Sequence, residues 1–470
     1  MVMGDLEQSS QVLVIGGGPA GYSAAFRATD LGLEVTLVDP SPRLGGVCLH
    51  SGCVPAKSLL FLTQVMRDAR RIESMGIVYA HPRIDLEAVR RWKTAVIDNL
   101  ADDLMQAGRR RDIQRIAARA QFDSSRSVRL QGCDISRIRF DHAIIATGTR
   151  PNVLAGAISQ PAGRIMDPAG ALDLTGIPER LLIVGGGYMG LELGTIYATL
   201  GSRVTLIEKG DRLLPGVDQD LVAPLQQHLA TLFESIQLNT QLVALQEADR
   251  DVAVKMEGGE TREIHFDSIL VASGVRAAVE GLGLEHTRVQ TDRRGFINVD
   301  ERQRTADGAI FAVGDVTGMP LLAHKAVRQG KVAAETIAGE PSAYDAQAVP
   351  VVVYSDPQIA WCGMTEEDAR RQNLPVTVIR RPWRHSARAA AMGAGEGLTK
   401  IIVDPANGRI IGAGIVGRQA EALIAEAVVA IEMGALAEDV ALCMHPIPTL
   451  SETIAEAAEL HSSHPDPLHH

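Results

Sequence analysis

The sequence of 470 residues contains few cysteines and no long apolar run. Five cysteines in so long a chain argue against the structural disulfide framework of small secreted proteins. A run of about 18 apolar residues, which a transmembrane helix needs, does not occur. The N-terminal stretch "MVMGDLEQSS" lacks the basic and apolar regions of a signal peptide. We therefore expect a cytoplasmic protein without a membrane partner.

The sequence also lacks an excess of basic residues. Its 46 Lys and Arg residues are outnumbered by 57 Asp and Glu residues, for a formal net charge of −11. Because nucleic-acid binding depends on a basic surface, no nucleic-acid partner is expected. Apolar residues make up 46% of the sequence and charged residues 22%, which indicates a globular protein with ample core material. A chain of this length typically divides into about three domains.

What the sequence does contain is a repeat. Residues 11–39 and 181–208 each begin with a short apolar strand, pass through G-x-G-x-x-G into a helix, and continue to a second strand that ends in an acid. The acid follows the first glycine at the same interval in both copies, from 16 to 39 and from 185 to 208. A single G-x-G-x-x-G is a weak signal, but two copies in this context predict two dinucleotide-binding folds. The less favoured alternative is a pair of ordinary βαβ units that bind no ligand.

Each copy has the residues that a dinucleotide site needs. The three glycines of a copy permit a tight turn, let the backbone approach a pyrophosphate, and let helix and strand pack closely, while the helix N-terminus offers N–H groups to the phosphates. These glycines are Gly16, Gly18 and Gly21 in the first copy and Gly185, Gly187 and Gly190 in the second. Asp39 and Glu208 would accept hydrogen bonds from an adenosine ribose. Because an acid there repels a 2′-phosphate, the second site should prefer NAD to NADP. We expect tightly bound FAD at the first site and exchangeable NAD at the second.

Three further segments place cofactor-type residues after apolar strands. Thr147 and Gly148 in "ATGTRP", and Gly274 in "VASGVRA", look like chain crossings at domain edges. "IFAVGDVTG" gives another strand that ends in Gly314 and Asp315, and the Asp315 carboxylate would suit a ribitol hydroxyl. We assign Thr147, Gly148 and Asp315 to the FAD site and Gly274 to the NAD site.

The composition changes from about residue 345 onward. "VPVVVYSDPQIAWCG" and "LTKIIVDPANGRIIGAGIVG" indicate strands, with "DPANG" as a turn between two of them, and Ala/Glu-rich runs indicate helices. Together they predict an α+β domain. The helical run "EALIAEAVVAIEMGA" has an apolar face that suits a core or subunit contact better than a cofactor. The tail "HSSHPDPLHH" is expected to be disordered, with adventitious metal binding as the alternative.

Cys48 and Cys53 lie close together in "LGGVCLHSGCVPAKSLL". If this segment begins one helix, the two sulfurs lie on nearby faces and could close a strained, reducible disulfide, and the helix N-terminus would lower a thiolate pKa. The other three cysteines are scattered without metal-ligand spacing, so no metal site is expected; they are Cys133, Cys362 and Cys443. A pair of inert buried cysteines is the alternative.

Lys57 falls about one helical turn after Cys53. A cation there could lie near a flavin and pair with an acid, for which Glu192 at the end of "GGGYMGLE" is the candidate. Taken alone, Lys57 would be read as an ordinary surface lysine.

Three stretches carry a resemblance to a known family. "GGVCLHSGCVPAK", with Ala56 in place of the usual Ser, "GDVTGMPLLAHKA" and "HPIPTLSE" resemble the motifs of the flavoprotein disulfide reductases (class I pyridine nucleotide-disulfide oxidoreductases), and within them the lipoamide dehydrogenases. The resemblance runs over residues 10–460. It implies an α/β fold with two Rossmann-like dinucleotide-binding domains, for FAD and NAD, and a C-terminal α+β dimerisation domain. The expected parts are an FAD domain with the redox disulfide (1–155), an NAD domain (156–275), a segment completing the FAD domain (276–346), the dimerisation domain (347–462) and a disordered tail (463–470).

The resemblance also implies residue roles. Cys53 would be the flavin-proximal thiol and Cys48 the interchange thiol that faces substrate, with Lys57 and Glu192 paired beside the flavin. Tyr188 matches a position that covers the flavin until nicotinamide arrives. The backbone of "LLAH" would line the flavin through Leu321, Leu322, Ala323 and His324. The family forms homodimers in which the C-terminal domain completes the partner's active site, and its members serve lipoyl-bearing carriers of 2-oxoacid dehydrogenase complexes.

The terminal loop departs from that pattern. Lipoamide dehydrogenases read His-Ala-His-Pro-Thr here, and the second His is the base, held by a Glu five residues later. Aligned without a gap, "EDVALCMHPIPTLSE" places Ile447 at the base and Glu452 at its orienting position, while His445 matches the first His. In an alternative alignment, "IP" is an insertion after His445 and Pro446, and a base is restored. However, the flanks match without gaps on both sides.

The missing base leaves three hypotheses for function. The first is NAD-dependent oxidation of protein-bound dihydrolipoamide, slowed by about 10²–10⁴-fold unless Glu452 or His445 takes over proton transfer. The second is NADH-dependent reduction of another acceptor (a quinone, a different disulfide or a metal ion), because hydride transfer between flavin and nicotinamide needs no such base. The third is a non-catalytic subunit of a multienzyme complex, against which the intact cofactor and cysteine motifs speak.

Overall fold

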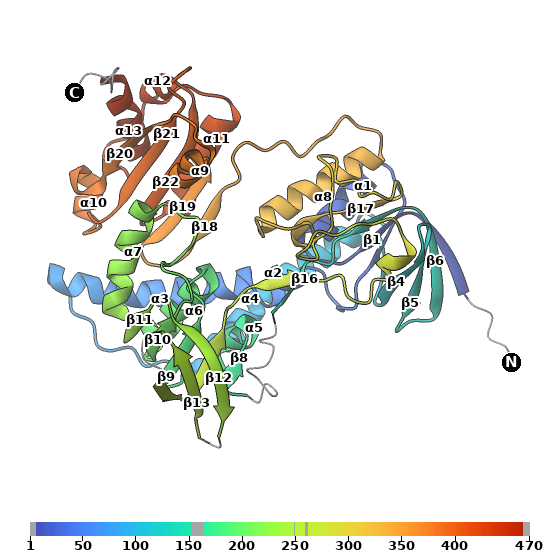
Figure 1. The fold of residues 1–470 in the computed structure, drawn as a ribbon, viewed down its shortest axis with the longest axis horizontal. Helices are drawn as coiled ribbons and strands as arrows, with labels where there is room; N and C mark the ends of the chain where they lie inside the picture. The colour runs from blue at the N-terminus through green and yellow to red at the C-terminus, as the bar shows by residue number, and fades with distance from the viewer. Residues whose placement is uncertain (1–5, 153–162, 249, 259–261, 464–470) are drawn as a thin grey trace. The chain divides into compact units, whose positions relative to one another are not determined.

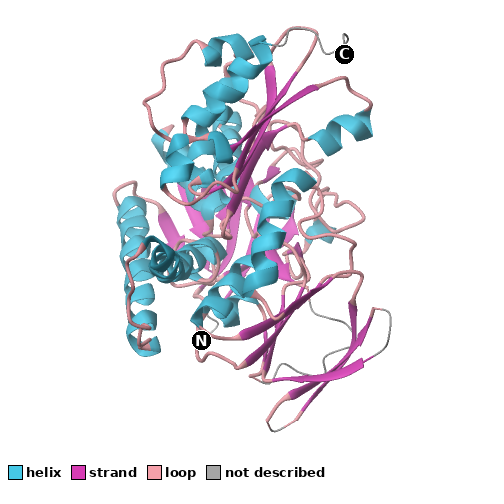
Figure 2. Cartoon of the chain, turned by 90° about the vertical axis from the view of Figure 1, so that its left-hand side faces the viewer, coloured by secondary structure: helices cyan, strands magenta, loops and turns pink. Residues whose placement is uncertain are grey.

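The computed structural model of the chain describes residues 6–152, 163–248, 250–258 and 262–463. Helices and strands are mixed throughout the described chain (Figure 2). The chain divides into two compact units. The first unit consists of residues 1–58, 85–153 and 273–345, and the second consists of residues 59–84, 154–272 and 346–470.

The first unit is built on a seven-stranded sheet around the long strand β6 (Ile135–Ile145). On one side β6 pairs in parallel with β1 (Leu6–Ile15); on the other, its last residues pair in parallel with β17 (Ile310–Ala312) and its first half pairs antiparallel with β5 (Ser127–Gln131). The sheet continues through β2 (Val35–Val38), β3 (Gln114–Ile116) and β4 (Arg119–Ser124). A strand near residue 311 therefore belongs to the same sheet as the N-terminal strands.

Helices α1 (Pro19–Asp30) and α8 (Ala323–Ile337) pack against each other through small residues. A Cβ on Gly330 of α8 would lie 2.4 Å from the Ala20 carbonyl oxygen, which only a glycine avoids. The unit's other elements are α2 (Gly46–His50), the first residues of α3 (Cys53–Arg71), α4 (Leu86–Arg109), the paired β7 (Thr149–Pro151) and β16 (Val275–Ala277), and the 3₁₀ turns η2 (Leu284–His286) and η3 (Gly314–Thr317).

The second unit holds a five-stranded parallel sheet with helix α6 (Tyr188–Leu200). Its strand order is β11 (Ser235–Gln237), β10 (Arg203–Ile207), β9 (Arg180–Val184), β15 (Ser268–Val271) and β8 (Ile165–Met166). Helices α5 (Pro168–Leu172) and α7 (Gln219–Leu232) accompany it, as does an antiparallel sheet of β12 (Gln241–Glu247), β13 (Val252–Glu257) and β14 (Arg262–Phe266). The predicted boundary at 155/156 falls at residues outside the described ranges.

The same unit contains a five-stranded antiparallel sheet in the C-terminal region (orange to red in Figure 1). Its order is β18 (Val351–Val353), β19 (Gln358–Gly363), β22 (Ile410–Gly417), β21 (Leu398–Val403) and β20 (Thr377–Pro382). Helix α11 (Ala420–Glu432) packs on β19 and β22, and α13 (Glu452–Ser463) packs on β20 and β21. Short helical segments complete the unit: η1 (Ile72–Met75), α9 (Glu366–Gln372), η4 (Trp383–His385), α10 (Ala387–Ala391) and α12 (Ala437–Ala441).

Trp383, in η4, belongs to the hydrophobic core of this C-terminal region. Its side chain is fully buried, and its indole N–H donates to Thr399 Oγ1 at 2.8 Å. Gly397 and Gly417 lie against the ring, where a Cβ on either residue would come within 2.2 Å of it.

The expected disordered tail begins at residue 463, whereas α13 ends at Ser463, so the helix and the expected tail overlap by one residue. Residues 464–470 lie outside the described ranges.

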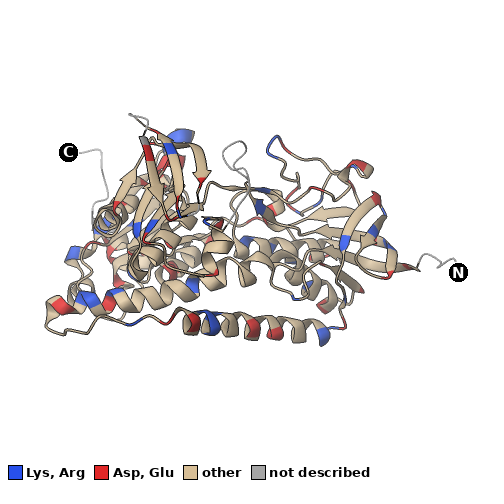
Figure 3. Ribbon diagram, turned by 90° about the horizontal axis from the view of Figure 1, so that it is seen from below, with Lys and Arg blue, Asp and Glu red and all other residues tan. Residues whose placement is uncertain are grey.

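Charged residues of both signs are interleaved along the described helices (Figure 3). Arg137, for example, pairs with both Glu7 and Asp123 on the sheet of the first unit. Among the described helices, none combines the length and apolar character needed to cross a bilayer.

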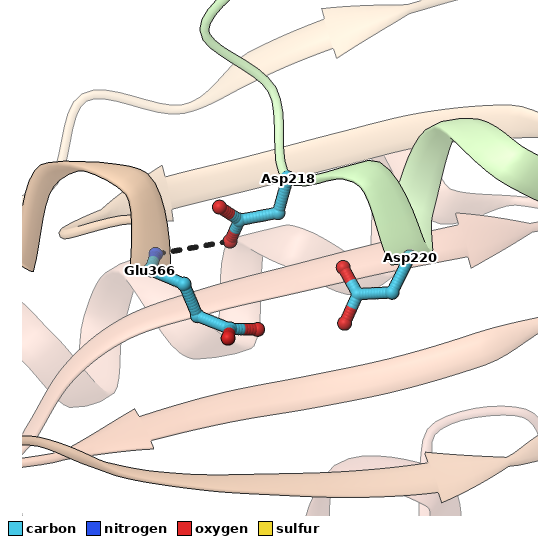
Figure 4. Close-up of side chains that lie close together, drawn as sticks. All are labelled: Asp218, Asp220 and Glu366. Atoms are coloured by element: carbon cyan, nitrogen blue, oxygen red, sulfur yellow. Dashed lines mark hydrogen bonds between the residues drawn. The ribbon is translucent and has the colours of Figure 1, made fainter. Parts of the chain in front are cut away.

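A buried cluster of three carboxylates lies in the second unit. The side chains of Asp218, Asp220 and Glu366 point toward one another (Figure 4). The ammonium group of Lys400, which is 1% exposed, donates to all three carboxylates at 2.6, 2.8 and 2.9 Å respectively. Burial alone raises the pKa of Asp220, but hydrogen bonds from Lys400 and Arg380 outweigh it and hold that pKa below its ordinary value. The chain therefore supplies its own cation to this cluster.

Asp218 has a second role in the cluster. Its two carboxylate oxygens accept the backbone N–H groups of Glu366 and Glu367 at 3.1 Å each, at the start of α9 (dashed for Glu366 in Figure 4). The carboxylate thus satisfies N–H groups that have no partner within the helix. Strand β21, helix α7 and helix α9 are joined at one point by these contacts.

We predict that Lys400→Met lowers the free energy of unfolding by about 3–5 kcal/mol, because removing one partner of a buried ionic cluster leaves uncompensated charge. The deficit should narrow at acid pH, because the Asp220 carboxyl, whose pKa is held below its ordinary value, no longer needs the ammonium once it protonates. Denaturant unfolding followed by circular dichroism at neutral and acid pH measures both effects. Lys331→Met, at an exposed lysine on α8, is the matched control. Equal stability of the two variants would contradict the prediction.

Candidate functional site

The first glycine-rich turn joins β1 to α1. Gly16 has φ +111°, and a Cβ there would lie 2.3 Å from the Ala146 carbonyl oxygen, so the turn requires glycine. A Cβ on Gly21 would lie 1.8 Å from the Gly16 carbonyl oxygen, which is the close helix–strand approach expected from the sequence. Gly18 caps α1, and a Cβ there would meet only Gly46 Cα, at 3.8 Å. The backbone at the helix N-terminus is therefore open on that side.

The second turn repeats this geometry between β9 and α6. Gly185 has φ +115°, and a Cβ on Gly190 would lie 2.1 Å from the Gly185 carbonyl oxygen. Gly187 caps α6 and has open space where its Cβ would be.

The acid that ends the second strand of each repeat binds the backbone of its own turn. Asp39 accepts the N–H of Gly17 at 2.5 Å and that of Ser41 at 2.7 Å. Glu208 accepts the N–H of Gly186 and that of Gly210, both at 2.7 Å. From the sequence, these acids were expected to bind the ribose only. The equal interval from glycine to acid in the two repeats was the available signal for this second role. A carboxylate that accepts two N–H groups keeps lone pairs for a ribose hydroxyl.

The cysteine pair lies at a break between two helices, not on one helix as considered from the sequence. Cys48 is in α2, which ends at His50, and Cys53 is the first residue of α3. The chain turns at Ser51 and Gly52, where a Cβ on Gly52 would lie 2.9 Å from the Val47 carbonyl oxygen. This places Cys53 at the positive end of the helix dipole of α3.

The side chains of Cys48 and Cys53 interact with each other. The hydrogen bond that the Cys48 thiol donates to Cys53, together with burial, raises the pKa of Cys48 well above its ordinary value, and the nearby charge of Lys57 opposes this rise. Lys57, one turn along α3, is thus close enough to the pair to act on its charge. Asp315 acts on Cys48 in the opposite sense. The fold therefore brings Cys48, Cys53, Lys57 and Asp315 into one neighbourhood of the first unit.

Asp315 lies in η3 and is held from α8. Burial raises the pKa of its carboxyl, and the charge of Lys325 opposes that rise. The Lys325 ammonium, which is buried, donates to the Gly318 carbonyl at 2.7 Å, and Gln329 accepts the N–H of Gly314 at 2.9 Å. The sequence analysis did not single out Lys325 and Gln329. The available signal was that Lys325 and Gln329 lie one helical turn apart, on a face of the helix that is otherwise apolar.

Thr147 and Gly148 follow β6 in the same unit. The Thr147 hydroxyl is buried and has no hydrogen-bond partner in the described structure, and Gly148 has φ +70° with open space at its Cβ position. A buried hydroxyl without a partner is costly unless a ligand satisfies it. The orphaned Thr147 hydroxyl, the open backbone at Gly18 and the half-buried Asp315 carboxyl suit a flavin dinucleotide. The four residues assigned to the flavin by backbone contact lead into α8, which begins at Ala323 after the N-cap Leu322; they are Leu321, Leu322, Ala323 and His324.

Two predicted nicotinamide-site residues lie on α6. Tyr188 is its first residue and is 46% exposed, whereas Glu192 is fully buried and accepts the N–H of Tyr354 at 3.0 Å. Glu192 belongs to the second unit and Lys57 to the first, so their predicted pairing stays a prediction. Gly274, with φ +106°, accepts the Asn152 N–H at 3.0 Å beside the β7–β16 pair. This is the kind of chain crossing that its sequence context indicates.

The terminal loop runs from the end of α12 to α13. Ile447 is 81% exposed, and Glu452, at the start of α13, accepts the backbone N–H of Thr449. His445 instead contacts Glu426 of α11, with Nε2 2.6 Å from Oε1. Burial lowers the pKa of His445, but hydrogen bonds to Glu426 and the Cys443 carbonyl outweigh it and raise the pKa above its ordinary value. The sequence analysis missed Glu426 because no local pattern links it to the loop.

Known proteins of the same architecture match this chain over nearly its whole length. The pyridine nucleotide-disulphide oxidoreductase family model matches residues 10–330, and the model of that family's dimerisation domain matches residues 349–458. The dihydrolipoyl dehydrogenase of Buchnera aphidicola subsp. Schizaphis graminum is 40% identical over 458 residues, covering 97% of this chain and 96% of the relative. The protein of the same name from Haloferax volcanii is 39% identical over 468 residues, 98% of each chain.

Solved structures agree with these relatives. LpdA of Mycobacterium tuberculosis superimposes with a TM-score of 0.88 at 28% identity, covering 96% of this chain and 99% of that chain. RclA of Escherichia coli, described as an HOCl-induced flavoprotein disulfide reductase, gives a TM-score of 0.85 at 26% identity with the same coverage.

These comparisons confirm the α/β fold and the family expected from the sequence. FAD and NAD(H), predicted from the two glycine-rich turns, are the cofactors of this family. The match to the dimerisation domain supports a homodimer. The chain therefore belongs to the pyridine nucleotide-disulphide oxidoreductases.

Proposed function

We propose that this protein is a dihydrolipoyl dehydrogenase, which oxidises protein-bound dihydrolipoamide with NAD⁺. The observation that carries the proposal is the interacting Cys48–Cys53 thiol pair, in the unit that holds the first glycine-rich turn and the half-buried Asp315. The relatives that bear this name support it, because they match at 39–40% identity over almost the full length of both chains. The cofactor residues proposed are those of the two turns, with Thr147, Gly148, Asp315 and residues 321–324 at the flavin.

The cysteine pair would exchange one disulfide for another. In the oxidised enzyme, a substrate thiolate attacks Cys48 Sγ, the Cys48–Cys53 bond breaks, and Cys53 leaves as a thiolate. The second substrate thiol, on losing its proton, attacks the mixed disulfide and releases Cys48, so the substrate becomes a disulfide and the pair becomes a dithiol. Bound FAD supplies the two-electron transfer from this dithiol to NAD⁺. The N-terminus of α3 and the Lys57 charge favour the Cys53 thiolate as the leaving group.

The chain's own residues would hold the two nucleotides. Asp39 and Glu208 keep the two turns shaped for a pyrophosphate by binding their backbone N–H groups. The Asp315 carboxyl would accept a ribitol hydroxyl. We propose that Tyr188 gates the nicotinamide site and that Glu192 pairs with Lys57.

Lipoyl-bearing carriers of a 2-oxoacid dehydrogenase-type complex are the proposed partners, and the cytoplasm is the proposed location. A second copy of the chain would cover exposed apolar side chains in the dimerisation region, such as Val429 of α11 and Met433 directly after it, which are 62% and 80% exposed.

One observation favours a second function. Ile447 presents an apolar side chain where the family's base is expected, and RclA, a structural neighbour, is described as a disulfide reductase. An enzyme without the base could use NADH to reduce another acceptor, such as a quinone, a different disulfide or a metal ion. Both functions share the flavin and nicotinamide sites, so they differ in the acceptor alone.

We predict that Cys53→Ser abolishes NAD⁺ reduction by dihydrolipoamide but leaves NADH–dye activity within about threefold of the native enzyme. The reason is that dye reduction takes electrons from the flavin and bypasses the thiol pair. Stopped assays of both reactions on the same preparation test this, with Cys133→Ser, at an exposed cysteine of the first unit, as control. Retained dithiol activity in Cys53→Ser would refute the proposed role of the pair.

We predict that Ile447→His increases dihydrolipoamide oxidation by about 10²–10⁴-fold near neutral pH, because a positioned base deprotonates the attacking thiol. Dye activity should not change. The comparison of kcat/KM for dihydrolipoamide in native and variant enzymes measures the effect, with Ile447→Gln as a polar control that cannot act as a base. If the native enzyme already matches Ile447→His, the base is supplied elsewhere.

A further inference from the structure

His445 is tied to the body of the second unit through both of its ring nitrogens. Nε2 lies 2.6 Å from Glu426 Oε1 on α11, and Nδ1 lies 3.0 Å from the Cys443 carbonyl oxygen. The His445 side chain is only 12% exposed. It therefore differs from the neighbouring side chains of the loop, since Met444 is fully exposed and Ile447 is 81% exposed.

The identity of the two partners fixes the protonation state of the ring. A carbonyl oxygen and a carboxylate oxygen accept hydrogen bonds and cannot donate them. Both ring nitrogens of His445 must then carry hydrogen for both contacts to be hydrogen bonds, and this is true of the imidazolium alone. A neutral His445 would leave one nitrogen lone pair facing an acceptor.

The charged groups around the ring agree with this assignment. Glu426 faces it from α11 and Glu452 acts on it from α13, and both carboxylates raise the pKa of His445. The Cys443 thiol does not face the ring, because it donates to the Asp439 carbonyl at 3.3 Å. The balance of charge at the ring therefore favours the cation.

We propose that His445 is a positioning residue and not the base that replaces the one missing at Ile447: as an imidazolium clamped between Glu426 and the Cys443 carbonyl, it fixes the apolar terminal loop to α11. A base needs a free lone pair, and a ring whose two nitrogens both donate has none.

The clamp is one of two anchors of the loop. The other is Thr449, whose N–H donates to Glu452 and whose hydroxyl donates to the Pro446 carbonyl at 2.8 Å. Ile447 lies between the two anchors. Without them the chain would have to hold large exposed apolar side chains in place by backbone stiffness alone. The loop is thus fixed by polar contacts while its outward surface stays apolar.

This inference rests on the proposed dithiol oxidation for its kinetic consequence. Without a histidine base in the loop, the enzyme takes the substrate thiolate that solution provides. The value of kcat/KM for dihydrolipoamide should then rise about tenfold per pH unit below the thiol pKa of about 8.5. Ile447→His should flatten this slope, because the new base supplies the deprotonation step.

The first test compares His445→Gln and Glu426→Gln with the native enzyme in both the dithiol and the NADH–dye assays. We expect the ratio of the two activities, and the pH slope of the dithiol reaction, to stay within about twofold of native in each variant. His265→Gln, at an exposed histidine that lies 3.2 Å from Asp251, is the matched control. A selective loss of dithiol activity of about 10²-fold or more in His445→Gln would identify His445 as the base and overturn the proposal.

The second test follows stability against pH and does not depend on substrate. A histidine whose folded pKa is raised contributes stability that is fully present below its unfolded pKa of about 6.5 and is lost as pH rises through the folded pKa. The Tm difference between native enzyme and His445→Gln should be largest near pH 6 and shrink by pH 9, and Glu426→Gln should show the same trend. A difference that does not vary with pH would overturn the clamp. If the native enzyme shows strong dye activity and no dithiol activity even in Ile447→His, the proposed function fails, and the Tm test still decides the clamp.

Discussion

The hydrogen bonds from the glycine-rich turns to the acid at the end of the next strand are the contacts on which both nucleotide sites depend. Asp39 and Glu208 each bind a turn N–H, and they do so at corresponding positions of two separate sheets. A turn with positive-φ glycines has many accessible backbone states, and a carboxylate that binds its N–H groups selects one of them. The open side of that turn then faces the place where a pyrophosphate would bind at the helix N-terminus. Ribose binding and turn shape thus depend on the same carboxylate.

Buried polar groups in this protein fall into two kinds, distinguished by whether the chain satisfies them. The carboxylates of Asp218, Asp220 and Glu366 surround an ammonium from the chain itself, so that cluster is complete and serves stability. The Thr147 hydroxyl has no partner in the described structure, and Asp315 keeps a raised pKa despite Lys325. Groups of the second kind are costly in the absence of a ligand, which is why they indicate a binding site and the first kind does not.

The redox reaction has two parts. Dithiol exchange requires proton transfer at sulfur, and electron transfer between the two nucleotides does not. Electron transfer between the two nucleotides depends on the glycine-rich turns, and those are intact. Dithiol exchange depends on a thiolate, and the proposed alignment places the family's histidine base at the position of Ile447. Under the proposal above, the hydrogen bonds of His445 to two acceptors hold the loop in place and leave proton transfer to the substrate and solvent.

The sequence by itself determined the α/β class, the two dinucleotide turns, the cofactors, the thiol pair and the family. These follow from short-range patterns, because a G-x-G-x-x-G turn, its acid and its helix are fixed by backbone conformations within one strand–helix–strand unit. The residue assignments beyond the turns stay predictions. The break of the helix between Cys48 and Cys53 has a local signal in the sequence, since Gly52 follows Ser51 there. The spacing of the two cysteines is also compatible with one helix and does not reveal the break.

Only the tertiary structure decided which distant residues meet. Lys400 lies 182 positions from Asp218 in the chain, and Glu426 lies 19 positions from His445 on another element. Such pairs depend on strand order and helix packing, for which a single sequence carries no local pattern. The physical reason is that a buried charge must be paired wherever the fold places it, while the sequence records the charge and not its neighbour.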